Sequence, residues 1–506
     1  MQFRESRAYG LSLSVLTSLL ALLLVANSCT GPEIPAKESI NNITEQAIIF
    51  PDYDGITIPP DIAPLNFTVK EDGTSFIAIL EGKKGGSIQL QSRNKEFRIP
   101  AGKWKKLLMS NRGSQLTIRI LRIDENQWSE FLPIINQIAP EPINSYLAYR
   151  LIPPGYQTWS EMGLFQRDLS SFKETPIIRN QQLNNNCVNC HSFCNWDSEN
   201  MMFHIRGSMG GTMLKLGKEI EKVNTKTEET LSAGVYPSWH PSGNYVAFST
   251  NKIEQYFHAD PRKTIEVYDR NSDLIVYNTK DYTISHVPGT RGNQYMETFP
   301  CWSPDGKFLY FSRTDADSET PFDSIRYDIY RIEFNLQNGN FGETEAVLEV
   351  SGKGLSASFP KISPDGNYLL CTVHNYGTFP IWHKEADLCL VDLRTGISEI
   401  PEINSDNTDS YHAWSSNNRW IVFSSRRYDG RYTKLYISYM NEDGEFQKAF
   451  LLPQDDPGFY DSFFFSYNVP ELFDNAVRVN PRRWSRIASR SDNHVVDALI
   501  GTGEVE

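Results

Sequence analysis

Residues 236–249 read YPSWHPSGNYVAFS, and this stretch decides the fold because the chain repeats it. Residues 299–312 read FPCWSPDGKFLYFS, a third copy at 359–370 reads FPKISPDGNYLL, and a weaker fourth at 412–424 reads HAWSSNNRWIVFS. Each copy places a tight-turn sequence between two runs that are rich in aromatic and β-branched residues. The repeat therefore predicts a series of β-hairpins in which each unit covers the apolar face of the next.

A second alternating segment follows each copy, at 265–268, 329–332, 388–391 and 435–438. With these segments the repeats resemble the TolB-type, WD-like propeller family, whose members close six four-stranded blades around a central channel. The resemblance covers roughly residues 187–452. It implies the fold but no chemistry. We expect the run after each turn to form the inner strand of its blade.

Two further blades complete the predicted ring. The segment 192–216 aligns with the start of the repeat and supplies one of them. The sixth is predicted to be shared between distant parts of the chain, with 146–151 and 163–166 joined by 463–467. Such closure protects the edge strands of the ring.

Short alternating segments also occur between residues 45 and 135, separated by turn-forming stretches, which is typical of a small antiparallel sandwich. The sequence thus predicts an all-β protein, with an N-terminal β-sandwich (45–135) followed by a six-bladed β-propeller (140–480). Residues 481–506 are expected to form a loosely ordered polar tail.

The first 28 residues have the features of a lipoprotein signal peptide. Arg4 and Arg7 precede an apolar run from Leu11 to Ala26, and Cys29 follows where such signals place the lipidated cysteine. Residues 29–44 are small and polar, as expected of a tether. We therefore expect a protein of the bacterial cell envelope, anchored by lipid at a periplasmic or outer-membrane surface.

Composition narrows the expected partners. The formal net charge is -13 and the sequence has no basic tract, which argues against nucleic acid. Envelope proteins or a redox partner are expected instead. The sequence also lacks the G-x-S-x-G elbow of serine hydrolases, since residues 354–358 read GLSAS, and we assign no catalytic residue.

Residues 187–191, Cys-Val-Asn-Cys-His, form a CxxCH pentapeptide. This motif is similar to the haem-attachment motif of c-type cytochromes, in which two thioethers hold haem and the histidine binds its iron. The resemblance is confined to these five residues. It implies one covalent haem c held by Cys187 and Cys190, with His191 as the proximal iron ligand.

A distal iron ligand is sought near the motif, because methionine or histidine there favours electron transfer, whereas an open position permits ligand binding. Met209 and Met213 are the more accessible guesses. Met201, Met202 and His204 are also close in sequence, but the blade alignment places them on a strand where alternate residues belong to the core.

The neighbouring Cys194 leaves two other interpretations open. Cys187, Cys190, His191 and Cys194 together have the spacing of a zinc cluster, or Cys194 pairs with another cysteine in a disulfide. Cys301, Cys371 and Cys389 fall on predicted blade strands and are interpreted as small core residues.

These observations favour an envelope lipoprotein whose propeller carries a c-type haem, for redox or electron transfer or for haem-based sensing within an envelope assembly. The alternative is a non-haem propeller scaffold that binds a protein, peptide or glycan and whose cysteines are structural. A third, weaker possibility is an enzyme that uses haem as its catalyst, which requires an open iron site.

Overall fold

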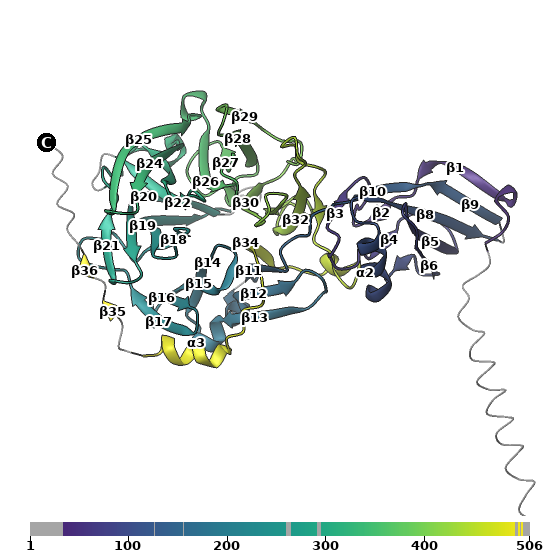
Figure 1. Ribbon diagram of the computed structural model, residues 1–506, viewed down its shortest axis with the longest axis horizontal. Helices are drawn as coiled ribbons and strands as arrows, with labels where there is room; N and C mark the ends of the chain where they lie inside the picture. The colour runs from purple at the N-terminus through teal and green to yellow at the C-terminus, as the bar shows by residue number, and fades with distance from the viewer. Residues whose placement is uncertain are drawn as a thin grey trace, which may run out of the picture.

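The computed structural model describes residues 34–490 except 126, 155, 260–264 and 291–294, together with 494–495 and 497–498. The predicted signal peptide and Cys29 lie outside these residues. Figure 1 shows a small β domain beside a larger ring of sheets. The fold class is the predicted one, an all-β protein built around a propeller. No helix in the described ranges has the length and apolarity needed to cross a membrane.

The N-terminal domain consists of two sheets and one helix. Strands β1, β9, β8, β10 and β3 form the larger sheet together with β5 and β6, and β2, β4 and β7 form the smaller one. Their bounds are β1 Ile40–Gln46, β2 Ile49–Phe50, β3 Thr57–Ile58, β4 Phe67–Val69, β5 Ser75–Gly82, β6 Ser87–Ser92, β7 Glu96–Phe97, β8 Ser114–Asp124, β9 Gln127–Leu132 and β10 Ile134–Ile138.

Sequence patterning missed the helix of this domain, α2 (Ala101–Ser110). It lies between β7 and β8 and buries Trp104, Leu107 and Leu108. The indole Nε1 of Trp104 donates a hydrogen bond to the Ile62 carbonyl at 3.0 Å, which fixes the helix to the sandwich. Because three of its residues, at 103, 105 and 106, are lysines, the apolar face of this short helix is difficult to recognise in the sequence.

Six sheets of the described chain form the ring in Figure 1. In chain order from the CxxCH motif, the first blade consists of β14 Cys187–Cys194, β15 Asp197–Arg206, β16 Gly211–Leu216 and β17 Glu219–Asn224, and the second of β18 Val235–Trp239, β19 Tyr245–Phe257, β20 Ile265–Asn278 and β21 Thr283–His286. The third blade consists of β22 Met296–Trp302, β23 Phe308–Thr314, β24 Asp328–Asn335 and β25 Asn340–Leu348, and the fourth of β26 Ser356–Ile362, β27 Tyr368–His374, β28 Asp387–Asp392 and β29 Ile397–Glu399. The fifth blade consists of β30 Asp409–Trp414, β31 Trp420–Ser425, β32 Lys434–Tyr439 and β33 Phe450–Leu451.

The sixth blade joins two distant parts of the chain, as predicted. Strand β34 (Ser466–Phe473) pairs antiparallel with β11 (Tyr146–Ile152), which continues into β12 (Gly163–Asp168) and β13 (Glu174–Arg179). The closing strand begins at Ser466, whereas we predicted 463–467. Near the C-terminus, β35 (His494–Val495) and β36 (Asp497–Ala498) add parallel to β17 and β21.

The turns of the repeat form as predicted. The glycines of three copies, Gly243, Gly306 and Gly366, have φ of 71°, 73° and 76°, a left-handed conformation that glycine adopts without steric cost. Their amides donate back across the turns to the carbonyls of His240, Ser303 and Ser363 at 2.8–2.9 Å.

The order of strands within a blade differs from the prediction. We expected the run after each turn to be innermost, but the strand before the turn is the one that lines the centre and contacts the inner strands of its neighbours, as β18 contacts β14 and β22. The reason is proline. Three of these strands contain an aromatic residue followed by Pro, which lacks the N–H needed inside a sheet and is tolerated on an edge strand. The CxxCH motif lies within the inner strand β14, not ahead of it.

Two other segments differ from the prediction. Residues 253–257, which lie between two predicted blade segments, continue β19 in a long hairpin with β20 as far as Phe257 opposite Ile265. The blade part of β20 is therefore near Leu274, not at 265–268. Residues 481–488, expected to be loose, form helix α3 (Pro481–Ala488). Asn480 caps it, Pro481 begins it, and Trp484 is buried against Phe203.

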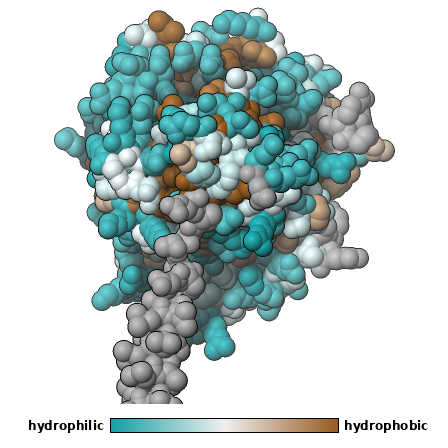
Figure 2. Space-filling view, turned by 90° about the vertical axis from the view of Figure 1, so that its right-hand side faces the viewer, coloured by the Kyte–Doolittle hydropathy of each residue, from teal (hydrophilic) through white to brown (hydrophobic). Residues whose placement is uncertain are grey.

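The sandwich packs on the fifth blade. Tyr53, Ile58 and Trp104 of the sandwich share one buried apolar cluster with Trp420 and Phe450 of that blade. The Tyr53 hydroxyl donates to the Leu451 carbonyl at 3.4 Å. Figure 2 views the sandwich end, where apolar side chains are scattered among hydrophilic ones outside the grey atoms. The apolar surface of the sandwich is thus buried largely within the molecule.

Candidate functional site

The inner strands carry a ring of six residues with positive φ. They are Cys190 (50°), Tyr236 (51°), Phe299 (51°), Phe359 (57°), Tyr411 (45°) and Val469 (47°). At each of them the pairing register shifts, as in a β-bulge. Positive φ is uncommon outside glycine, and a bulge redirects side chains. The second cysteine of the CxxCH motif thus occupies a place that four other blades give to an aromatic residue.

This ring surrounds a central cavity of about 290 Å³. Tyr236, Phe299, Phe359 and Tyr411 form an aromatic wall with Phe379, with neighbouring ring centroids such as Tyr236 and Phe299 4.5 Å apart. The residue directly after each positive-φ position also lines the cavity, and these six residues form a second tier below the first ring: His191, Pro237, Pro300, Pro360, His412 and Pro470. Two histidines therefore replace proline in this tier.

His191 is buried, with 4% of its surface exposed, and lines the cavity. Burial, together with the nearby Arg150 and Lys361, lowers the pKa of its ring to about 3. The ring makes a hydrogen bond with the Val469 backbone, while Nε2 has no partner within the described part of the chain. A neutral imidazole with one nitrogen that has no partner among the described residues is able to bind a metal ion.

His412 has the same character and was missed by sequence reasoning. It lines the cavity, its Nε2 donates to the Leu370 carbonyl at 2.8 Å, and its Nδ1 lacks a partner among the described residues. Burial lowers its pKa to about 3. The available signal was the pair Tyr411-His412 at the place where other copies have an aromatic residue and proline.

The two thiols of the motif lie near the same cations. Cys190 lines the cavity, and burial raises the pKa of its thiol, a rise that Arg206 and Arg150 oppose. Cys187 lies beside it, and its sulfur accepts a hydrogen bond from Nη2 of Arg150 at 3.1 Å. Both cysteines are free thiols in this structure.

Cys194 lies apart from the motif. It is buried between the first two blades against Met202 and Trp239, and burial raises its pKa to about 11. Among the described residues no three His, Cys, Asp or Glu side chains gather as metal ligands, and the cysteines at 187, 190 and 194 are all free. The described residues thus show neither a zinc cluster nor a disulfide at the motif. Cys301, Cys371 and Cys389 are buried core residues, as predicted.

The two predicted distal ligands do not line the cavity. Met213 is fully buried in the core of the first blade with Phe203 and Trp484. Met209 is half-buried in the turn between β15 and β16, where its amide donates to Asn186 at 3.1 Å. Of the predicted site, the structure brings Cys190 and His191 into the cavity wall with Cys187 behind them.

Charged residues complete the cavity and were not predicted. Arg150 from β11, Arg206 from β15 and Lys361 from β26 line it with the acid Glu471 from β34. Burial raises the pKa of Glu471 to about 7, and Lys361 opposes the rise. Three cations thus face one carboxyl that is only partly ionised near neutral pH. These four residues come from separate strands, so no local motif revealed them.

A second cavity of about 380 Å³ opens toward the other side of the propeller. The two cavities share Ser192, Pro237, Lys361, Ala413 and Glu471, so these residues lie between them. Trp196, Trp239, Trp302 and Trp414 line this second cavity. The propeller therefore has a central channel in which the polar residues Ser192, Lys361 and Glu471 lie between two aromatic compartments.

Comparison with known proteins finds only distant structural likenesses. No family model and no curated protein matches this chain. Among solved structures, it is similar to a chain of a nidogen/laminin complex at 6% identity, covering 65% of this chain and 100% of that one with a TM-score of 0.38. It is also similar to the Dos1 propeller at 14% identity, covering 46% of this chain and 64% of that one with a TM-score of 0.27. A third similar structure is prolyl oligopeptidase B from Galerina marginata, at 11% identity, covering 61% of this chain and 44% of that one with a TM-score of 0.36.

Proposed function

We propose that this protein is a ligand-binding propeller whose central cavity takes an anionic ligand with a flat or apolar body, such as a peptide carboxylate. One observation carries the proposal: Arg150, Arg206 and Lys361 converge on a cavity that has an aromatic wall and a single acid, Glu471, among its described lining residues. Pockets with an apolar wall and a few converging polar groups are typical binding sites.

Arg150 is the cation that most needs a partner. It is half-buried, and its Nη2 bonds run to the sulfurs of Met162 at 2.9 Å and Cys187 at 3.1 Å. Thioether and thiol sulfurs are weak acceptors. Its Nε is buried without a partner within the described ranges. A guanidinium in this state gains a strong hydrogen bond from a carboxylate, which accepts in the planar geometry that arginine offers.

The test is calorimetric titration with a panel of N-acetyl dipeptides of aromatic residues, each as free acid and as amide. We expect at least one acid to bind clearly better than its amide, and Arg150→Gln to weaken that acid by about tenfold or more. Arg394→Gln, on an exposed arginine of the fourth blade, is the matched control. If every pair binds equally or not at all, the proposal is wrong.

Covalent haem is the second candidate, because the free Nε2 of His191 lies in the channel wall beside Cys190. The donor set fits: Cys187 and Cys190 would hold the group, His191 would bind its iron, and haem would supply one-electron chemistry. Haem is itself a flat dianion, so the same cations suit it. Together with the lipid anchor expected at Cys29, this candidate describes a protein of the cell envelope. It would exchange electrons with an envelope partner, or it would sense small haem ligands on behalf of that partner.

The haem candidate is tested by a pyridine haemochrome spectrum and an intact mass of the full chain made in a host that matures c-type cytochromes. A spectrum retained after acid-acetone extraction supports it. A bare polypeptide from that host would remove it and leave the non-haem ligand.

A further inference from the structure

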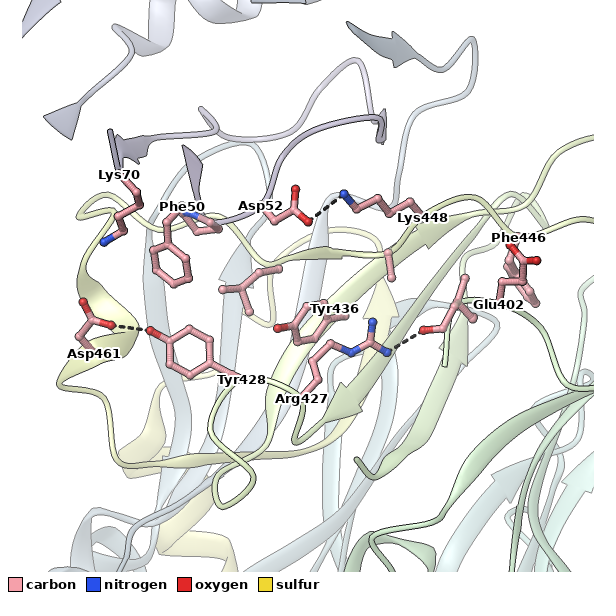
Figure 3. A pocket seen from close by; sticks show the side chains of 14 residues that line it. Phe50, Asp52, Lys70, Glu402, Arg427, Tyr428, Tyr436, Phe446, Lys448 and Asp461 are labelled. Atoms are coloured by element: carbon pink, nitrogen blue, oxygen red, sulfur yellow. Dashed lines mark hydrogen bonds and ion pairs between the residues drawn. The ribbon is translucent and has the colours of Figure 1, made fainter. Parts of the chain in front are cut away.

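A larger cavity, of about 900 Å³, lies where the sandwich meets the fifth blade. Figure 3 shows its walls: Phe50, Asp52 and Lys70 come from the sandwich, and Arg427 and Tyr428 face them from the propeller. The central channel and this cleft have no lining residue in common. It is therefore a separate site, which neither function proposed above uses.

Aromatic rings form the floor of the cleft. Phe50 and Tyr428, from the two domains, have ring centroids 5.8 Å apart. Tyr436 lies behind them, with the guanidinium of Arg427 4.6 Å from its centroid. Phe50 and Tyr428 are half-buried, so part of each ring is open to the cavity. Such partly exposed rings offer apolar faces to a ligand.

The charges of the cleft balance. Lys70, Arg427 and Lys448 carry positive charge, and Asp52, Glu402 and Asp461 carry negative charge. Lys448 pairs with Asp52 across the domain boundary at 2.8 Å, as drawn in Figure 3. The hydroxyl of Tyr428 donates to Asp461 at 2.6 Å. A cleft with equal numbers of both signs does not select an anion or a cation, in contrast to the central channel.

From this balance we infer that the cleft binds a neutral oligosaccharide. Sugar rings present apolar C–H faces that pack on aromatic rings, and their hydroxyls both donate and accept, which suits ammonium, guanidinium and carboxylate groups side by side. An extended peptide is disfavoured because β2 and β33, the strands beside the cleft, have two residues each and offer no long edge for pairing.

The experiment is calorimetric titration of the folded full chain with neutral hexasaccharides: maltohexaose, cellohexaose, xylohexaose and mannohexaose. We expect one of them to bind, and Tyr428→Ala to weaken it by about tenfold. Tyr256→Ala, on a tyrosine that is 48% exposed on the β19 and β20 hairpin, is the matched control and should bind as the parent does. Asp461→Asn, on the surface, repeats the test with a change that leaves the core intact.

The inference is overturned if none of the four sugars binds, if Tyr256→Ala weakens binding as much as Tyr428→Ala, or if Tyr428→Ala instead abolishes binding of the acidic dipeptides. The Arg150→Gln variant separates the two sites, because it should lose the dipeptide acid and keep the sugar.

Discussion

Cys190 in β14 and Tyr236 in β18 occupy the same position in neighbouring blades, with φ of 50° and 51°. Strands β14 and β18 pack side by side, and both side chains line the central cavity. Cysteine is much smaller than tyrosine. The substitution therefore opens the aromatic wall on the side where Arg150, Arg206 and His191 lie, and it accounts for the position of the cavity.

Restoring an aromatic residue at this position should close the cavity. We expect Cys190→Phe to fold with a loss of no more than about 1–2 kcal/mol, because Phe299 and Phe359 adopt the same backbone conformation. Binding of the dipeptide acid should fall at least about tenfold by calorimetry. Cys190→Ser, which keeps the small side chain, is the control. Undiminished binding by Cys190→Phe would place the ligand elsewhere.

The two channel histidines predict acid sensitivity. Because burial lowers the pKa of His191 and His412 to about 3, each stabilises the fold fully above its ordinary pKa near 6.5, and this contribution is lost as the pH falls toward 3. Each should add about 1.4 kcal/mol per pH unit to the slope of unfolding free energy in that window.

Urea unfolding at several pH values between 4 and 8 measures this slope, and His412→Gln should reduce it by about 1.4 kcal/mol per unit. His258→Gln, on an exposed histidine, is the matched control. An unchanged slope in His412→Gln would contradict a lowered pKa of this imidazole in the folded protein.

The carboxyl of Glu471, whose pKa is raised and not lowered, predicts that ligand binding depends on pH near neutrality. Its pKa is raised to about 7, chiefly by burial, so the carboxyl becomes charged as the pH rises through 7 and then repels an anion in the channel. Binding of the dipeptide acid should weaken from pH 6 to pH 8, and Glu471→Gln should abolish the dependence. Equal pH profiles for parent and variant would contradict this role.

The haem candidate predicts a sharp difference among the cysteines. Cys187→Ser combined with Cys190→Ser should remove the covalent haem spectrum, because both sulfurs of the motif are lost. Cys194→Ser should keep it, since Cys194 is buried between blades against Trp239. Intact mass after denaturation measures the outcome. Loss of haem in Cys194→Ser alone would contradict the arrangement of the site.

The repeat made the propeller predictable because turn glycines such as Gly306 and the alternation around them are local signals. The order of strands was mispredicted, since hairpin patterning does not say which strand faces the centre. The prolines after Tyr236, Phe299 and Phe359 indicate that these strands lie at the inner edge of each blade, because proline is tolerated on an edge strand. The site was predicted only where it was a contiguous motif. Arg150 and Glu471 lie on strands that close the ring from opposite ends of the chain, so their meeting depends on the tertiary fold.

The most direct measurement is a crystal structure of the full chain with the dipeptide acid that binds most tightly. The account predicts the carboxylate within hydrogen-bond distance of the Arg150 guanidinium and the aromatic side chain against the ring formed by Tyr236, Phe299 and Phe359. A ligand bound outside the channel, or a channel without ligand at saturating concentration, would contradict it.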